Sequence, residues 1–324
     1  MNIEKIKYRP EIDGLRAIAV FAVIIYHAKT FILGYEILPG GYLGVDIFFV
    51  ISGYLITSII YQEMLKTNSF SFVSFYKRRV RRILPLLFFI ISVSLPVAYF
   101  VLLPNSLVEF TKSILFTIGF TSNFYFYFSG QEYHAIESLF NPFLHTWSLS
   151  IEEQFYFIYP LIIFVSFFKF KKNIIIFISL LFICSFVLSI IQSQTDISKS
   201  FYFIHTRLWE LLLGCLVAIY ESKYNFIKSI KTNSSIISNI SFFFLLLSFQ
   251  LFDHDIKHPS YLSFFPPFFT CLMILFLKKD QFISKILSSR IIVFLGLISY
   301  SLYLWHYPIF AFYRVYFAGR SYLN

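Results

Sequence analysis

An arginine and a histidine lie on one face of the first long apolar segment, Leu15 to Leu33. Arg16 and His27 are eleven positions apart, close to three helical turns, so a helix projects both side chains from one face about 16 Å apart along its axis. In a bilayer core about 30 Å thick, this places a cation near one surface and a titratable imidazole past the midplane. Ionisable groups at such depth usually mark a transport pathway or a reaction site.

A carboxylate is predicted at the same depth as this histidine. Asp46 lies near the start of the next apolar segment, across a short connection from His27. There it would hold the imidazole in one tautomer and raise its basicity, which suits a general base. The alternative is a structural carboxylate that interacts with the amide dipoles at a helix start.

Other polar residues are predicted in this outer layer. Glu152 has no evident structural partner, while Arg207 and Glu210 lie one helical turn apart and could simply neutralise each other. His306, in the last apolar segment, would alone be typical of a satisfied core histidine. The convergence of these polar residues on one layer favours a functional site over separate structural roles. The members of this layer, with nearby polar and aromatic residues, are His27, Asp46, His145, Trp147, Ser148, Glu152, Arg207, Glu210 and His306.

The opposite, inner layer is basic. It contains Arg16 and the run from Lys77 to Arg82, which has five cations in six positions. Arginine binds phosphate with bidentate geometry, so this layer suits a phosphorylated cytoplasmic donor. The alternative is a membrane anchor that binds anionic lipid headgroups.

Composition requires that these residues be positioned by membrane helices. The chain of 324 residues is 58% hydrophobic, 22% aromatic and only 14% charged, which excludes an ordinary soluble domain. Its net charge of +10 is concentrated in short clusters between apolar segments, which indicates topology rather than nucleic-acid binding. The cysteines stand singly, so neither a disulfide nor a metal site is predicted.

The hydropathy pattern predicts an all-α bundle of about nine transmembrane spans. The predicted spans are 15–33, 41–62, 83–103, 148–168, 173–192, 203–221, 236–252, 261–277 and 291–313. A weaker segment, 111–128, is predicted to be re-entrant or interfacial, since a full crossing would put later basic clusters on the wrong face. The N-terminus is then cytoplasmic. A transporter or flippase is the main alternative to an enzyme, although no internal repeat supports it.

Several motifs resemble the acyltransferase 3 family of integral membrane O-acyltransferases. They are Arg9 to Val20, Tyr26-His27, Gly40 to Thr57, the arginine run ending in Pro85, His145 to Phe155, and Ser299 to Pro308. They occur in the family's order and cover nearly the whole chain. The segment from His145 to Phe155 looks most like the subgroup that carries a fused extracytoplasmic SGNH hydrolase domain.

The resemblance implies transfer of an acyl group, usually acetyl, from cytoplasmic acyl-CoA across the bacterial inner membrane. The acceptor would be a hydroxyl of a surface or lipid-linked polysaccharide, of the O-antigen, peptidoglycan or exopolysaccharide type. Acyl-CoA is then a substrate, and no resident cofactor is expected. His27, as general base or transient acyl carrier, would act with Asp46 and Glu152.

The remaining residues divide between the two substrates. Acyl-CoA would meet Arg16 and the family's Arg-x-x-Arg pair, whose register is open between Arg78/Arg81 and Arg79/Arg82. The candidates for the acceptor site are His145, Trp147, Ser148, Arg207, Glu210 and His306.

Two features depart from the family pattern. The chain stops at Asn324, so it is expected to be a single acyltransferase domain lacking the family's last helix and any soluble domain. It would then be either inactive or dependent on a separate SGNH-type partner. The loop Gln131-Glu132-Tyr133-His134 also differs from the subgroup, which suggests a different acceptor specificity.

Overall fold

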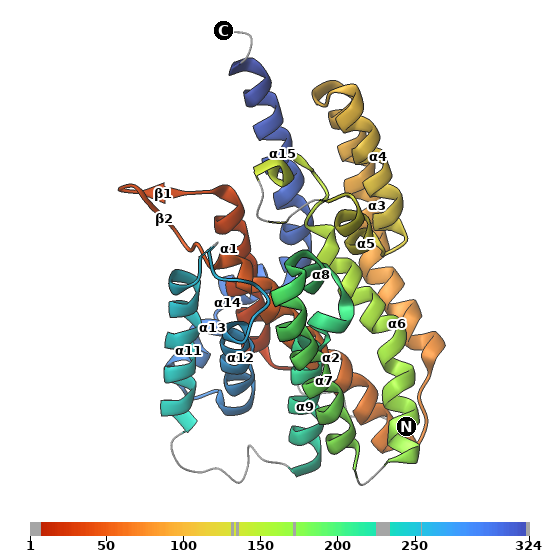
Figure 1. The fold of residues 1–324 in the computed structure, drawn as a ribbon. Coiled ribbons are helices and arrows are strands. Elements are labelled where there is room, and N and C mark those ends of the chain that lie inside the picture. Colours follow the sequence, from red (N-terminus) through yellow and green to blue (C-terminus); the bar gives the residue numbers. More distant parts are fainter. Residues whose placement is uncertain are drawn as a thin grey trace.

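The computed structural model describes residues 8–130, 133, 136–170, 173–224, 234–253 and 255–321. Nearly all of this is helical, and the only sheet in these ranges is a ribbon of β1 (Phe31–Ile32) and β2 (Tyr35–Glu36) (Figure 1). The all-α prediction is confirmed. Four residues named above lie outside the described ranges: Gln131, Glu132, His134 and Asn324. The basic clusters between apolar segments also include lysines outside these ranges, namely Lys5, Lys7, Lys171, Lys172, Lys228 and Lys231.

The helices follow one another along the chain with short connections. The N-terminal half contains α1 (Pro10–Ala28), α2 (Gly44–Thr67), α3 (Phe72–Val101), α4 (Pro104–Ile118), α5 (Ser122–Phe128) and α6 (Thr146–Lys169). The C-terminal half contains α7 (Ile174–Thr195), α8 (Ile197–Tyr202), α9 (Ile204–Tyr224), α11 (Ser234–Leu251), α12 (Phe265–Phe276), α13 (Phe282–Leu287), α14 (Arg290–Leu297) and α15 (Ser299–Ser321). Three short 3₁₀ helices precede α2, α6 and α12: η1 (Gly41–Leu43), η2 (Ile136–Phe140) and η3 (Leu262–Phe264).

Within the described chain, five helices are long and apolar enough to cross a membrane: α2, α3, α6, α7 and α11. A sixth span results if α14 and α15, which are bent by 65° at their junction, count as one. The predicted number of nine is not confirmed. Helix α12 is only 12 residues long, and α1 and α9 carry charged residues inward, including Arg16 and Arg207, which lowers their apolar character.

Two predicted segments differ from the observed elements. The first helix ends at Ala28 because Lys29 adopts a left-handed conformation with φ of 50°, so the chain leaves the helix before the predicted end at Leu33. The segment 111–128 is split between α4 and α5, and α5 packs on α6 and α8. At the break, Nε2 of Gln154 donates to the backbone carbonyl of Phe120 at 2.9 Å. The re-entrant or interfacial interpretation stays a prediction.

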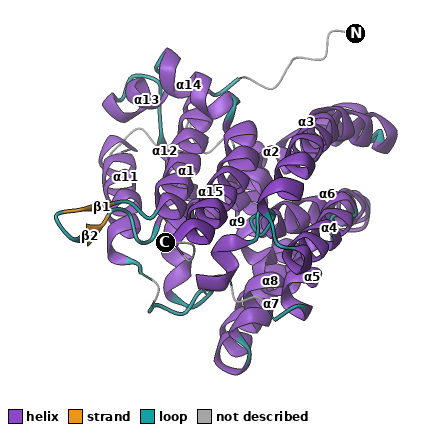
Figure 2. Ribbon diagram, turned by 90° about the horizontal axis from the view of Figure 1, so that it is seen from above, coloured by secondary structure: helices purple, strands orange, loops and turns teal. Residues whose placement is uncertain are grey.

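The centre of the bundle is built on close contact between α2 and α9. Gly53 of α2 lies against the backbone of Leu211, and Gly214 of α9 lies against that of Val50, leaving no room for a Cβ atom at either glycine. Small residues of this kind let membrane helices approach closely. Helices α1, α2, α9 and α15 lie near the middle of the molecule when it is seen from above (Figure 2).

A contact from α15 fixes the C-terminal end of α1. Nη2 of Arg314 donates to the backbone carbonyl of His27, and Nη1 donates to that of Leu139 at 3.4 Å. A guanidinium is favourable here because the last carbonyls of a helix carry partial negative charge. The contact brings α15 alongside the turn of α1 that presents His27.

Candidate active site

A large cavity opens between α1, α2, α3, α6 and α15. Its volume is about 1150 Å³, which is at the upper limit of typical ligand sites. The part lined by Arg9, Arg82, Lys278 and Lys279 is here called the basic end, although Glu11 and Glu221 also line the cavity and pair with Arg9. The other end, here called the histidine end, is lined by Ser148 and Tyr303.

The cavity distinguishes the two possible Arg-x-x-Arg pairs. Arg79 and Arg82 line it, whereas Arg78 and Arg81 are exposed and do not. The Arg79 guanidinium lies over the rings of Phe75 and Tyr156, with centroid distances of 5.6 and 5.4 Å. Of the two registers left open by the sequence, the cavity therefore favours Arg79/Arg82, because residues on successive helical positions face different directions.

Arg16 lies inside the cavity wall, as predicted for the inner layer. Its Nη1 donates to Oδ1 of Asp13 at 3.0 Å, one turn earlier on α1, and both side chains are largely buried. Arg82 makes no direct ion pair among the described residues, but the carboxylates of Glu152 and Glu153 are close enough to interact with its charge. Arg16 is thus partly neutralised by Asp13, while Arg82 faces two carboxylates of the cavity wall without a direct pair.

Glu152 lies in a different environment from the one predicted. It lines the same cavity as Arg16, Arg79 and Arg82, and accepts a hydrogen bond of 3.3 Å from the hydroxyl of Tyr156. Its assignment to the outer layer beside His27 was wrong. Helix α6 begins at Thr146 and turns Glu152 toward the cavity, on the face that also carries Ser148.

The histidine end of the cavity is closed by a pair of hydroxyls. Oγ of Ser148 lies 2.6 Å from the hydroxyl of Tyr303, which donates to the backbone carbonyl of His145 at 2.9 Å. Behind Tyr303, on the side away from the cavity, its ring contacts the rings of His145 and His306 at 5.4 and 5.3 Å between centroids. One tyrosine therefore separates the cavity from a cluster of histidines.

His27 and His306 form the centre of this cluster. Nδ1 of His27 lies 3.1 Å from Nε2 of His306, and Nε2 of His27 lies 2.7 Å from the hydroxyl of Tyr133. Both imidazoles are buried. The structure brings together two residues that are 279 positions apart in the sequence, as expected for the outer layer.

His145 completes the cluster. Its ring stacks on that of Tyr307 at 5.3 Å and meets that of His306 edge-on at 5.4 Å. Both of its ring nitrogens are buried with no hydrogen-bond partner among the described residues. Such groups normally bond to water or to a ligand.

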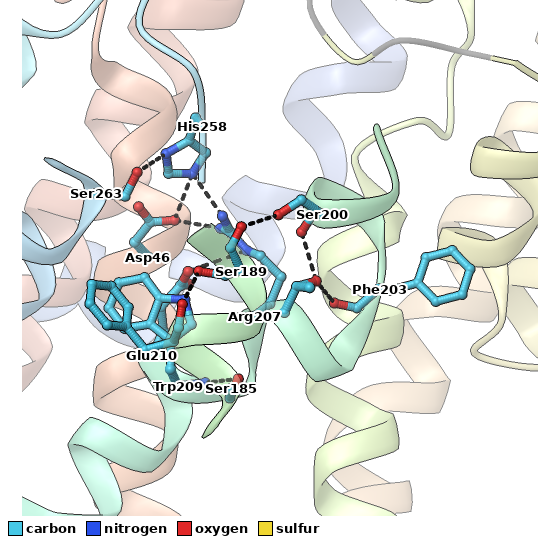
Figure 3. A network of polar contacts seen from close by, with 12 residues as sticks. Asp46, Ser185, Ser189, Ser200, Phe203, Arg207, Trp209, Glu210, His258 and Ser263 are labelled. Atoms are coloured by element: carbon cyan, nitrogen blue, oxygen red, sulfur yellow. Dashed lines mark hydrogen bonds and ion pairs between the residues drawn. The ribbon is translucent and has the colours of Figure 1, made fainter. Parts of the chain in front are cut away.

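The prediction that Asp46 orients His27 is wrong. Oδ1 of Asp46 instead accepts a hydrogen bond of 2.6 Å from Nη2 of Arg207, and Nε of Arg207 lies 3.3 Å from Oε1 of Glu210 (Figure 3). All three side chains are fully buried. Asp46 enters this ion-pair network because α2 packs on α9, a contact between distant segments that local spacing does not reveal.

The network also includes His258, which the sequence analysis did not select. Its Nδ1 lies 2.8 Å from Oγ of Ser263, and its Nε2 lies 2.8 Å from Nη1 of Arg207 and 3.3 Å from Asp46. Burial lowers the pKa of His258, although Asp46 acts in the opposite direction. The neutral ring accepts the hydrogen bond from Arg207. As one histidine in a connecting loop, it carried no sequence signal.

Aromatic rings join the network to the histidine cluster. The Arg207 guanidinium lies 5.6 Å from the ring centroids of Trp147 and Phe201. Tyr133, which bonds His27, stacks on Phe201 at 4.7 Å and meets Trp147 edge-on at 5.7 Å. Of the predicted acceptor residues, Trp147 is thus separated from His27 by Tyr133, and Arg207 lies beyond Trp147 and Phe201.

Comparison with known proteins identifies the family of this chain. The model of the acyltransferase domain of the acyltransferase 3 family matches residues 9–323. The chain belongs to the acyltransferase 3 family. The match includes both the cavity and the histidine cluster, and the apolar helices make this family member a multi-pass membrane protein.

Relatives of this chain occur in Staphylococcus aureus. O-acetyltransferase OatA of strain NCTC 8325 / PS 47 is 35% identical over 323 residues, which is 96% of this chain and 52% of the relative. The protein of the same name from strain COL gives the same values. The chain therefore spans about half the length of the curated relatives it matches. No solved structure matches the chain significantly.

Proposed function

We propose that this protein moves an acetyl group from cytoplasmic acetyl-CoA to a hydroxyl of a cell-surface or lipid-linked polysaccharide. The observation that carries the proposal is the cavity of about 1150 Å³, which has cations at its basic end and reaches Tyr303, the residue next to the His27–His306 pair. The membership of the family and the OatA relatives support the same reaction class.

The cavity suits the two chemically different ends of acetyl-CoA. The phosphates of the nucleotide would lie at the basic end, against Arg82 and Lys279, with Arg79 nearby. The pantetheine arm would follow the apolar wall of α2, and the thioester would lie near Ser148 and Tyr303. In this orientation, the basic end of the cavity and the N-terminus would face the cytoplasm. The protein itself would lie in the bacterial inner membrane.

His27 would serve as the general base. It removes the proton of the acceptor hydroxyl, whose oxygen then forms a bond to the thioester carbonyl carbon. The bond from that carbon to sulfur breaks, and CoA leaves as a thiolate that takes up a proton. The acceptor reaches His27 from the side of Tyr133, on which Trp147 and Phe201 provide an aromatic wall of the kind that packs against sugar rings.

The test is a pair of histidine variants compared in membranes supplied with radiolabelled acetyl-CoA. His27→Ala should abolish the incorporation of label into envelope glycan. It should also abolish the extra acetate that alkali releases from intact cells carrying the wild-type protein, compared with cells that lack it. His205→Ala is the matched control, because His205 is exposed and bonds only Gln192 on the surface. Wild-type labelling by His27→Ala, at equal amounts of protein in the membrane, would refute the proposal.

A further inference from the structure

The hydrogen bonds of the histidine pair have a defined direction. Nδ1 of His306 lies 2.5 Å from the backbone carbonyl oxygen of Tyr303, one turn earlier on α15. A carbonyl oxygen can only accept, so Nδ1 of His306 carries the proton. A neutral imidazole has one N–H, which leaves Nε2 of His306 as an acceptor.

This direction determines the tautomer of His27. Because Nε2 of His306 accepts, Nδ1 of His27 must donate across the 3.1 Å contact. Nε2 of His27 then carries the free electron pair, and it accepts from the Tyr133 hydroxyl at 2.7 Å. Neutral rings are consistent with the surroundings, since the described contacts of the pair are with tyrosines, His145, Phe310 and the Arg314 guanidinium, and include no carboxylate.

We infer that His306 is a positioning residue, which holds His27 in the tautomer with a basic Nε2 facing the reacting hydroxyl. The inference rests on the proposed role of His27. In a serine protease, a buried carboxylate performs this task for the catalytic histidine. Here the acceptor is a second imidazole, held in turn by a main-chain carbonyl, and it assumes the role that the sequence suggested for Asp46.

The His27–His306 hydrogen bond also stabilises the protonated form of His27. When Nε2 of His27 takes the proton of the acceptor hydroxyl, Nδ1 of His27 still donates to His306. The hydrogen bond becomes charge-assisted and therefore stronger, so it stabilises the imidazolium as it forms. No covalent bond to His306 is made, and His306 touches neither substrate.

Two substitutions separate positioning from packing. His306→Gln retains a side-chain oxygen that can accept from Nδ1 of His27, whereas His306→Phe retains a ring of similar shape without an acceptor. We expect His306→Phe to lower kcat for acetyl transfer about 100-fold with KM for acetyl-CoA within about threefold of wild type. His306→Gln should recover kcat to within about tenfold of wild type.

An equal loss of kcat in the Gln and Phe variants would overturn the inference. An effect confined to KM, with kcat unchanged, would also overturn it. His27→Ala tests the proposed function separately: if that variant keeps its activity, the base assignment fails whatever the His306 variants do. Thermal unfolding in detergent shows whether each variant is folded.

A measurement on the unmodified protein removes any dependence on variant folding. Nitrogen-15 NMR of the histidine-labelled chain in micelles distinguishes the two neutral tautomers of an imidazole. The resonances of His27 and His306, assigned by their loss in the single variants, should both report a proton on Nδ1. A proton on Nε2 of His27 would overturn the inference.

Discussion

The hydroxyl of Tyr303 lies 2.6 Å from Oγ of Ser148 in the cavity, while the carbonyl of Tyr303 accepts the hydrogen bond that directs His306. A single residue thus contacts both parts of the candidate site. A thioester that reaches Ser148 is separated from the histidine pair by the thickness of one side chain. Tyr303 would therefore have to move aside for a thioester at Ser148 to reach an acceptor hydroxyl held by His27.

Filling the histidine end should prevent transfer without preventing donor binding. Ser148→Leu puts a bulky side chain where the thioester would lie, and displacement of a reacting group by about 1 Å can cost about 100-fold in rate. We expect that loss in kcat, with CoA binding measured by calorimetry unchanged within about threefold. Ser148→Ala, which removes the hydroxyl but leaves the space, should retain most of the activity. Equal activity of the Leu and Ala variants would show that the thioester lies elsewhere.

The arginine run offers an internal comparison. Arg79 and Arg82 line the cavity, and Arg78 and Arg81 do not. A charge-assisted hydrogen bond contributes about 1.5–3 kcal/mol, so Arg82→Gln and Arg79→Gln should each raise KM for acetyl-CoA about tenfold or more. Arg78→Gln and Arg81→Gln are matched controls expected within about twofold of wild type. The reverse pattern would mean that the phosphates bind outside the cavity.

Local spacing accounts for the arrangement along α1. Arg16 lines the cavity and His27 lies in the histidine cluster further along the same helix, since a helix fixes the axial distance between its residues. The arginine register could not be predicted, because the doubled arginines give two equivalent patterns until the packing face of α3 is known. The surroundings of Glu152 could not be predicted either, because its neighbours Arg16 and Arg79 come from α1 and α3.

The partners of the histidine were harder to predict. His27 contacts Tyr133 and His306, at separations of 106 and 279 residues. Asp46 and Arg207 meet across 161 residues because glycines let α2 and α9 approach. Such pairings depend on which helices are neighbours, and hydropathy alone does not determine that.

Asp46 should contribute to stability rather than to the basicity of His27. Asp46→Asn leaves the fully buried Arg207 with one charged partner fewer, and breaking a buried ion pair typically costs about 3–5 kcal/mol. We expect a lower unfolding midpoint in detergent, with residual activity in proportion to folded protein. Glu36→Gln, which removes the partly exposed pair with Lys29, is the control and should cost less than about 1 kcal/mol. Unchanged stability with lost activity would instead favour the His27–Asp46 dyad.

Tyr133 occupies the position that the acceptor hydroxyl needs. Its hydroxyl donates to Nε2 of His27 at 2.7 Å, so the acceptor must displace it before the base can act. Tyr133→Phe leaves Nε2 of His27 without this donor but keeps the ring that stacks on Phe201. We therefore expect kcat within about threefold of wild type and an equal or lower KM for the glycan acceptor.

Tyr133→Ala separates the ring from the hydroxyl. It removes the stacking on Phe201 as well, so it should raise the acceptor KM while the phenylalanine variant does not. Both constants are measured with acetyl-CoA saturating and the acceptor varied. If Tyr133→Phe lost activity as completely as His27→Ala, the phenolic hydroxyl would take part in the reaction itself, because Tyr133→Phe removes only that hydroxyl and leaves the imidazole of His27 in place.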